Sequence, residues 1–169
     1  MIIIGIDPGL ANTGWGIVET RGSLVRARAY GCISTKPTEP LNVRLGTIYR
    51  TLTEVVGTYD PTDMAIEKIF FGSNHKSAIA TAHARGAAMV AGSTLGLNVG
   101  EYTPMEIKKD VVGNGVADKY QVTYMVRSTL GLDHDPKPDH AADALAAALC
   151  HAHTIHTRAR MAAANREVC

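Results

Sequence analysis

The chain has 169 residues, of which 46% are hydrophobic and 20% are charged, and its formal net charge is +1. This composition predicts a single soluble globular domain, and no apolar run approaches the roughly 20 residues of a membrane span. Because the net charge is small, any binding of nucleic acid must come from a local basic patch. Cys32, Cys150 and Cys169 are odd in number and widely spaced, which argues against a disulfide framework and favours a reducing, cytoplasmic setting.

The first stretch, residues 1–19, predicts a strand, a tight turn and a second strand. Four of residues 2–6 are isoleucines, which favour strands, and this run ends at Pro8 and Gly9. Met1 leads directly into the strand, so we expect no signal peptide. Side chains alternate along a strand, which places Asp7 on the face of Ile3 at the carboxyl end of an apolar strand. A carboxylate there is costly unless it is hydrogen-bonded, paired or bound to a cation. An Asx-type turn would explain Asp7 equally well.

The remaining elements follow from alternation, helical spacing and capping residues. Strands are expected over 23–34, 63–69 and 98–102. Helices are expected over 41–57, 77–95, 104–112, 119–130 and 139–153, and residues 154–169 are expected to form a flexible tail. The Ala-rich helix over 77–95 could also serve as a dimer face, since small side chains allow close approach.

This order of elements predicts a mixed sheet covered by helices, with no linker that would divide the chain into two domains. The first three strands should form an antiparallel meander, and the last two arrive after helical crossovers. We therefore expect one α/β domain over residues 1–153.

Acidic residues on three separate elements can meet at one edge of this sheet. Asp7 ends the first strand, Glu67 lies late in the fourth, and His140 and Asp143 are three residues apart near the start of the last helix. If the first and fourth strands are parallel neighbours, their carboxyl ends bring Asp7 and Glu67 together, where ligands of α/β sheets usually bind. Asp139 points about 100° away round the helix and fits better as its N-cap.

Clustered carboxylates repel one another, and a hard divalent cation such as Mg²⁺ or Mn²⁺ removes that conflict. Two such ions can activate a water and stabilise the leaving oxygen of a phosphodiester. Each residue also has a structural explanation: Glu67 as a charge at a strand edge, Asp143 as an acid near a helix N-terminus, and His140 as a structural polar residue.

Five stretches in chain order resemble the RuvC family of bacterial Holliday-junction resolvases over about residues 2–153. They are GIDPGLANTGWGIVE, AIEKIFFGSN, HARGAAMV, EYTPMEIKKDVVGNGVADKYQV and HAADALAAALCH. The resemblance implies a ribonuclease H-like fold with a five-stranded mixed sheet flanked by helices on both faces. It also implies a homodimer, Mg²⁺-dependent paired nicking of four-way DNA junctions, and work with the RuvA and RuvB branch-migration proteins. By position, the catalytic and metal-binding residues would be Asp7, Glu67, His140 and Asp143.

His140 departs from the aspartate that many members of the family have at this position. Neutral imidazole binds Mg²⁺ less readily than a carboxylate does and tolerates Mn²⁺ better. Protonated imidazole would repel the metal. We therefore expect Mn²⁺ to substitute for Mg²⁺, and a steeper loss of activity at acid pH than an aspartate enzyme shows.

The resemblance also assigns DNA-binding residues. Lys108 and Lys119 match basic family positions, and both flank the loop over 113–115. Phe70 matches a loop aromatic that could stack on an exposed base at a junction, although Phe71 could take that role and core packing could explain either. Among the weaker candidates for DNA contact is Arg85.

Two other functions share parts of this pattern. Actin-like ATPases and sugar kinases also begin with a strand, an acid and a Gly-rich hairpin that holds phosphates. These proteins need two lobes and a second phosphate loop, which is not evident in 169 residues. A non-catalytic module that recognises branched DNA is the other alternative, but the three retained acids argue against it.

Overall fold

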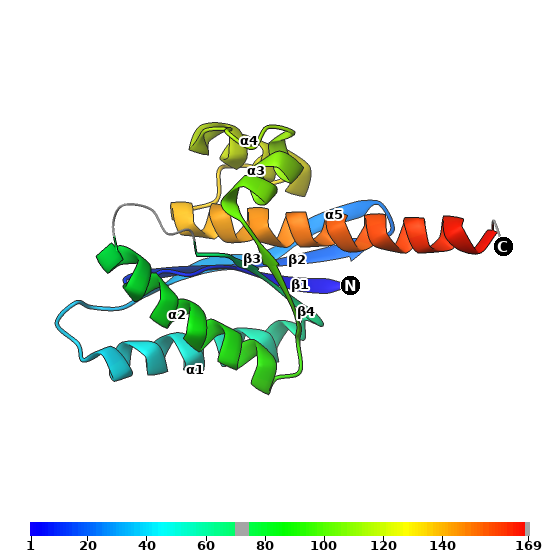
Figure 1. Ribbon diagram of the computed structural model, residues 1–169. Helices are drawn as coiled ribbons and strands as arrows, with labels where there is room; N and C mark the ends of the chain where they lie inside the picture. Colours follow the sequence, from blue (N-terminus) through cyan, green and yellow to red (C-terminus); the bar gives the residue numbers. More distant parts are fainter. Residues whose placement is uncertain (70–74, 168–169) are drawn as a thin grey trace.

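The protein is described by a computed structural model that covers residues 1–69 and 75–167 (Figure 1). Within these residues, a central sheet has α1 and α2 on one face and α3, α4 and α5 on the other, which confirms the predicted α/β architecture. The elements are β1 (Ile2–Asp7), β2 (Asn12–Arg21), β3 (Leu24–Ser34), α1 (Leu41–Tyr59), β4 (Asp63–Glu67), α2 (His75–Thr94), β5 (Asn98–Tyr102), α3 (Pro104–Val112), α4 (Lys119–Leu130) and α5 (Asp139–Glu167).

The five strands lie in the order β3-β2-β1-β4-β5. β1 pairs antiparallel with β2, and β2 with β3, whereas β1–β4 and β4–β5 are parallel. This is the predicted mixed sheet, with the first and fourth strands as parallel neighbours. Because Ile6 is aligned with Ile66, Asp7 and Glu67 follow at the same edge of the sheet.

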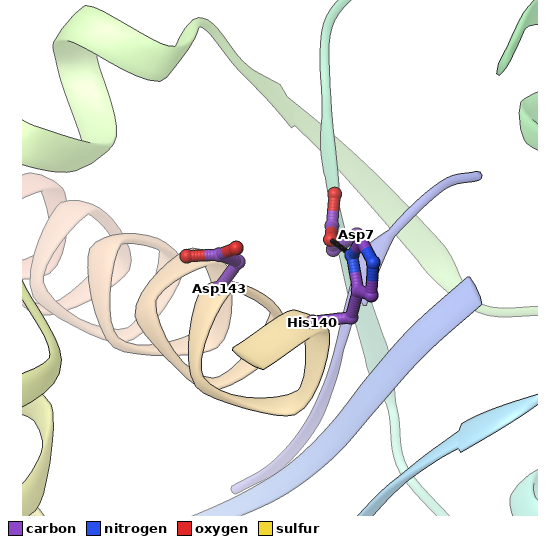
Figure 2. A group of neighbouring side chains, drawn as sticks. All are labelled: Asp7, His140 and Asp143. Atoms are coloured by element: carbon purple, nitrogen blue, oxygen red, sulfur yellow. Dashed lines mark hydrogen bonds and ion pairs between the residues drawn. The ribbon is translucent and has the colours of Figure 1, made fainter. Parts of the chain in front are cut away.

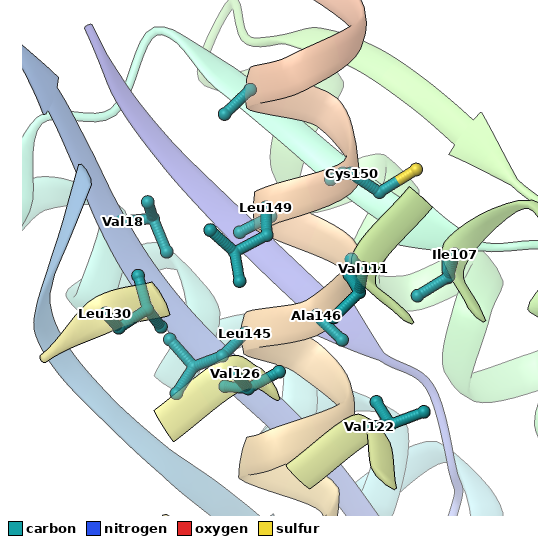
Figure 3. Packing of buried hydrophobic residues seen from close by; sticks show 14 of the residues in the cluster. Val18, Ile107, Val111, Val122, Val126, Leu130, Leu145, Ala146, Leu149 and Cys150 are labelled. Atoms are coloured by element: carbon teal, nitrogen blue, oxygen red, sulfur yellow. The ribbon is translucent and has the colours of Figure 1, made fainter. Parts of the chain in front are cut away.

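Alternate residues of β1 enter two separate cores, as the strand period requires. Ile3 packs on the side of α5, while Ile4 and Ile6 pack towards α1 and α2, and all three are fully buried. Figure 3 shows the core on the side of α5, where Leu145 and Leu149 lie among side chains from α3 and α4. Asp7 shares the face of Ile3, and therefore lies under α5.

Three glycines on β1 and β2 let the backbone of α5 lie directly on the sheet. A Cβ atom added at Gly5 would overlap the carbonyl oxygen of Ala144, and one added at Gly14 would overlap that of His140. At Gly16 it would meet the side chain of Leu145 at 2.7 Å. Any larger residue would therefore push α5 away from the strands. These glycines set the height of the first turns of α5 above Asp7.

A buried polar group also fastens α5 to the sheet further along the helix. His151 is buried, and its Nδ1 lies 2.7 Å from the hydroxyl oxygen of Tyr102 in β5. Its Nε2 lies 3.5 Å from Oδ1 of Asp63 in β4. Each partner satisfies a group that would otherwise be costly to bury. α5 thus contacts β1, β2, β4 and β5 at defined positions.

The predicted caps of α3 and α4 are confirmed. Thr103 accepts a hydrogen bond from the backbone N–H of Glu106 in a capping box, with Pro104 at the first helical position. Asp118 and Gln121 form the same arrangement at the start of α4, which ends at Gly131 in the left-handed conformation. These firm helix starts fix the positions of Lys108 and Lys119.

One detail of the sequence analysis is wrong: α5 does not end at His153 but continues to Glu167, so the segment expected to be a flexible tail is helical over 154–167. Ala84, Ala88 and Ala91 of α2 are fully buried within the chain's own core, so a dimer face on this helix would have to use its other side, and that face stays a prediction. The division into a nuclease domain over 1–153 and a tail stays a prediction.

Two smaller expectations concern the thiols and the helices. Cys32 and Cys150 are both free thiols, and Cys169 lies outside the described residues. No helix in the described part of the chain has the length and hydropathy needed to cross a membrane.

The contact between α5 and β1 predicts a large effect of a single methyl group. Gly5→Ala should lower the free energy of unfolding by about 1–3 kcal/mol or more, because the helix backbone must move away from the strand. Urea denaturation followed by circular dichroism measures this change.

Gly57→Ala is the matched control, since Gly57 is an exposed residue of α1 with nothing within 4 Å of the added Cβ. It should be neutral or stabilising by about 0.5–1 kcal/mol. Equal stability of the two variants would show that the close approach of α5 does not constrain the fold.

Candidate active site

A hollow of about 360 Å³ opens at the carboxyl edge of β1 and β4. The two strands form its floor, the start of α5 forms one side, and the first turns of α3 and α4 form the other. The residues that line it are Asp7, Glu67, Pro104, Ile107, Lys108, Lys119, Val122, His140, Asp143 and Ala146. All four predicted catalytic residues and both predicted lysines are therefore brought together.

Asp7 and His140 are hydrogen-bonded across the junction of sheet and helix (Figure 2). Nδ1 of His140 lies 2.7 Å from Oδ2 of Asp7. Asp7 is held by the end of β1 and His140 by the first turn of α5, which Gly14 allows to lie close to the strands. A neutral imidazole with its proton on Nδ1 donates to the carboxylate in this geometry.

Asp143 completes a group of three possible metal ligands. It lies one turn after His140, so both side chains project from the same side of α5 (Figure 2). One ligand atom from each of Asp7, His140 and Asp143 lies within 4.8 Å of the others. Two carboxylate oxygens and an imidazole nitrogen at this spacing match the donors that divalent cations take in proteins.

Glu67 lines the same hollow but does not belong to this group of three. Burial raises the pKa of its carboxyl group to about 7, and the charges of Asp7 and Asp143 add to the effect, while Lys108 opposes it. Burial also raises the pKa of Asp7; the hydrogen bond from His140 opposes this rise and the charge of Asp143 reinforces it. The acids at this edge therefore lack enough positive charge to balance them.

Lys119 supplies part of that balance. Its Nζ lies 3.3 Å from Oδ2 of Asp139 and 3.4 Å from Oδ2 of Asp143. Partial burial of Lys119 works against its ammonium form. The carboxylates of Asp143 and Asp139 together outweigh this effect, so the pKa of Lys119 is raised. Asp139 is the first residue of α5 and also pairs with Lys137, so it faces the lysines and does not join the group of three.

Arg85 has a role that its sequence position did not reveal. The sequence makes it only a weak candidate for DNA contact, but its Nε donates a hydrogen bond to the backbone oxygen of Glu67 at 3.2 Å. Its guanidinium also pairs with Glu101 in β5. Arg85 therefore fixes the end of β4, which carries Glu67. Only the fold reveals this contact, because it joins α2 to a backbone atom rather than to a complementary side chain.

Two of the predicted residues cannot be placed. Phe70 and Phe71 lie outside the described residues, so the predicted stacking aromatic stays a prediction from the sequence.

A scan against family models matches residues 3–151 to the family described as crossover junction endodeoxyribonuclease RuvC. A protein of that name from Moorella thermoacetica is 48% identical over 152 residues, which is 90% of this chain and 91% of the relative. The corresponding protein from Desulforamulus reducens is 46% identical, covering 90% of this chain and 93% of the relative.

Solved structures agree with the sequence comparisons. RuvC of T. thermophilus in complex with a Holliday junction substrate matches with a TM-score of 0.85 and 39% identity, over 90% of this chain and 93% of that one. The yeast mitochondrial Holliday junction resolvase Ydc2 matches with a TM-score of 0.60 and 11% identity, over 88% of this chain and 76% of that one, and shares the fold. The chain therefore belongs to the RuvC family of crossover junction endodeoxyribonucleases.

Proposed function

We propose that this protein is a metal-dependent endonuclease that resolves four-way DNA junctions by paired, symmetric nicks during recombination and DNA repair. The observation that supports this most is the hollow in which Asp7, His140 and Asp143 converge beside Glu67 and two lysines. Membership of the RuvC family supports the class of reaction. The T. thermophilus relative was solved with a Holliday junction as its substrate, which supports the choice of DNA.

The residues of the hollow fit a divalent cation. Burial and mutual repulsion raise the pKa values of Asp7 and Glu67, and a bound cation would relieve both effects. We propose that Asp7, Glu67, His140 and Asp143 hold two Mg²⁺ ions, with Mn²⁺ as an effective substitute. When bound, such ions supply a nucleophilic water and stabilise the leaving oxygen of the phosphodiester.

His140 and Asp7 hold a proton between them in the metal-free site. The proton lies in the hydrogen bond that joins Nδ1 of His140 to Oδ2 of Asp7. A cation that binds at Nδ1 requires this proton to move to Nε2, and any further protonation of His140 or Asp7 opposes the cation, since metal ligands have to be deprotonated. Metal binding should therefore weaken as the pH falls.

Lys108 and Lys119 bind the DNA backbone in this proposal. Both line the hollow, and Lys119 already lies beside the carboxylate of Asp143. An ammonium group there can contact a phosphate oxygen next to the bond that is cut. Phe70 would stack on an unpaired base, as the family resemblance implies.

We further propose that the protein acts as a homodimer. A four-way junction needs two nicks, and two copies of this chain supply two hollows. The outer side of α2 supports this arrangement: Ile79 is 58% exposed and Val90 is 56% exposed, on the opposite side of the helix from the buried alanines. Exposed apolar side chains of this kind favour contact with another protein surface.

The remaining partners follow from the family alone. RuvA and RuvB are the proposed branch-migration partners. The cytoplasm is the proposed location, because the free thiols of Cys32 and Cys150 fit a reducing compartment.

Nicking of a synthetic four-way junction tests the proposed function. With Mg²⁺ or Mn²⁺, the protein should cut two opposing strands symmetrically and leave a linear duplex intact, and a chelator should stop the reaction. Asp7→Asn should abolish cutting while junction binding stays within about threefold, because it removes a metal ligand and no phosphate contact.

Asp60→Asn is the control for this substitution. Asp60 is exposed at the end of α1 in the left-handed conformation, which asparagine also tolerates, so the variant should cut normally. Junction binding by the wild type without cutting would favour a non-catalytic module. Hydrolysis of a nucleotide without nicking would favour an ATPase.

His140→Asp should change the metal preference. An aspartate in place of imidazole should raise activity with Mg²⁺ relative to Mn²⁺ severalfold, and it should flatten the loss of activity at acid pH. Initial nicking rates over pH 5.5–8.5 with each metal measure both effects. If the ratio of the nicking rates with Mg²⁺ and Mn²⁺ and the loss of activity at acid pH both stayed as in the wild type, His140 would not be a metal ligand.

The raised pKa of Glu67 predicts an unusual pH dependence of the stability of the metal-free protein. Its pKa is about 7 in the folded protein and 4.5 ordinarily, so between these values the folded state holds a proton that the unfolded state lacks. The metal-free protein should therefore lose stability as the pH rises from about 4.5 to 7. Glu67→Gln should remove roughly 1–3 kcal/mol of this loss.

Urea denaturation at pH 5 and pH 8 with a chelator measures the effect of Glu67→Gln. Glu54→Gln, at an exposed position of α1, should retain the pH dependence of the wild type. If Glu67→Gln lost as much free energy of unfolding between pH 5 and pH 8 as the wild type, burial of the ionised Glu67 would not be the source of the pH dependence.

A further inference from the structure

The peptide group between Glu67 and Lys68 is held at both of its polar ends. The N–H of Lys68 donates a hydrogen bond to the backbone oxygen of Tyr102 in β5 at 2.7 Å. The carbonyl oxygen of Glu67 accepts a hydrogen bond from Nε of Arg85 at 3.2 Å. Glu67 is the last residue of β4, and its side chain lines the hollow. These two hydrogen bonds therefore fix the backbone from which the carboxylate of Glu67 enters the site.

Pro8 explains why a side chain has to supply one of the two bonds. β1 pairs with β4 up to the alignment of Ile6 with Ile66. The next donor that β1 would offer to β4 is the backbone N–H of residue 8, and proline has none. A partly buried carbonyl oxygen without a donor is costly. The guanidinium of Arg85 satisfies the oxygen that the ladder of hydrogen bonds leaves free.

Arg85 reaches this oxygen from behind the hollow. It does not line the hollow, and it belongs to α2, which covers the face of the sheet opposite α5 (Figure 1). Ala84 and Ala88 beside it are fully buried, so core packing holds this turn of α2. The side chain of Arg85 is only 17% exposed, and its guanidinium pairs with Glu101 in β5. Arg85 thus joins β5 to the end of β4 outside the space that a substrate would occupy.

The position of Glu67 needs this support because its carboxylate is repelled. Burial raises the pKa of Glu67, and the charges of Asp7 and Asp143 add to the effect, so the ionised group is unfavourable in the hollow. A free strand end would let this group turn away towards solvent. Functional groups must be held within about 0.5 Å of their productive positions. Groups that orient a metal ligand from outside are worth roughly 10–100-fold in metal affinity or activity.

We propose that Arg85 is a positioning residue, which holds Glu67 in place for metal binding and DNA cleavage by fixing the backbone at the end of β4. This inference rests on the proposed function, because it gives Glu67 the role of a metal ligand. It replaces direct DNA contact as the role of Arg85. The pair with Glu101 orients the guanidinium so that its Nε faces the carbonyl oxygen of Glu67.

Binding of Mn²⁺ without DNA and nicking of a four-way junction test this proposal. Arg85→Ala should raise the Kd for Mn²⁺, measured by electron paramagnetic resonance, about 10–100-fold, and it should lower the single-turnover nicking rate by a similar factor. The Kd for the junction, measured with Ca²⁺ in place of Mg²⁺, should stay within about threefold of the wild type, and its dependence on salt should not change, because no phosphate contact is lost.

A double variant shows whether the effect passes through Glu67. Glu67→Gln alone should weaken Mn²⁺ binding, because it removes a ligand. Adding Arg85→Ala to Glu67→Gln should change the Kd for Mn²⁺ less than about twofold, since residue 67 no longer supplies a carboxylate that has to be positioned.

Two further variants separate the geometry of Arg85 from its charge. Arg85→Lys keeps the positive charge but lacks the planar fork that bonds to Glu67 and Glu101 together, so it should recover only part of the loss. Arg50→Ala removes an exposed arginine from α1 and should leave Mn²⁺ binding and nicking unchanged. Circular dichroism should show the fold of the wild type in every variant.

Several outcomes would overturn the proposal. Arg85→Ala could bind Mn²⁺ and nick the junction as the wild type does, or Arg85→Lys could restore full function, which would leave only a role for charge. An equal loss of Mn²⁺ affinity with and without the carboxylate of Glu67 would place the action of Arg85 elsewhere. Weaker junction binding with a shallower dependence on salt would assign Arg85 to a DNA phosphate. If the wild type bound Mn²⁺ but did not nick the junction, the proposed function alone would fail, and the Mn²⁺ measurements would still decide the role of Arg85.

Discussion

Direct contact between the backbone of α5 and the strands β1 and β2 is the constraint on which this structure depends. Gly5 and Gly14 leave no side chain between the backbone of α5 and the strands, and Gly16 makes room for the side chain of Leu145, so the first turn of α5 lies within hydrogen-bonding distance of the end of β1. Without that approach, the chain would still form a sheet and a helix, but Asp7 and His140 would not meet. The close packing of α5 on these three glycines thus brings the functional groups of the site together.

The electrostatics of the hollow follow from the same arrangement. Packing brings acids from three elements into a partly buried space, and Lys119 balances only some of their charge. The fold therefore stores an unfavourable interaction that a divalent cation would relieve, and the free energy released contributes to binding of the cation. Rigid elements hold most of these groups, so few side chains need to reorganise when a ligand arrives.

Most of this arrangement was predictable from local patterns. Alternation and caps identified every strand and the starts of α3 and α4, whereas the parallel pairing of β1 with β4 was a condition of the predicted site that the structure meets. The continuation of α5 beyond His153 was missed. The alanines and arginines there favour a helix by intrinsic propensity alone, whereas the end of the helix was predicted from the apolar residues that pack on the sheet. The contact of Arg85 with the backbone of Glu67 and the pairing of Lys119 with Asp143 depend on tertiary packing, which spacing along the chain does not encode.

The two partners of the hydrogen bond between Asp7 and His140 are separated by 133 residues. The first strand and the last helix of the chain therefore meet at the site, and the elements between them complete the sheet and cover it. During synthesis, Asp7 leaves the ribosome early, and His140 emerges only after nearly the whole domain has been made. A nascent or prematurely ended chain consequently lacks the assembled acidic group and should not cut DNA.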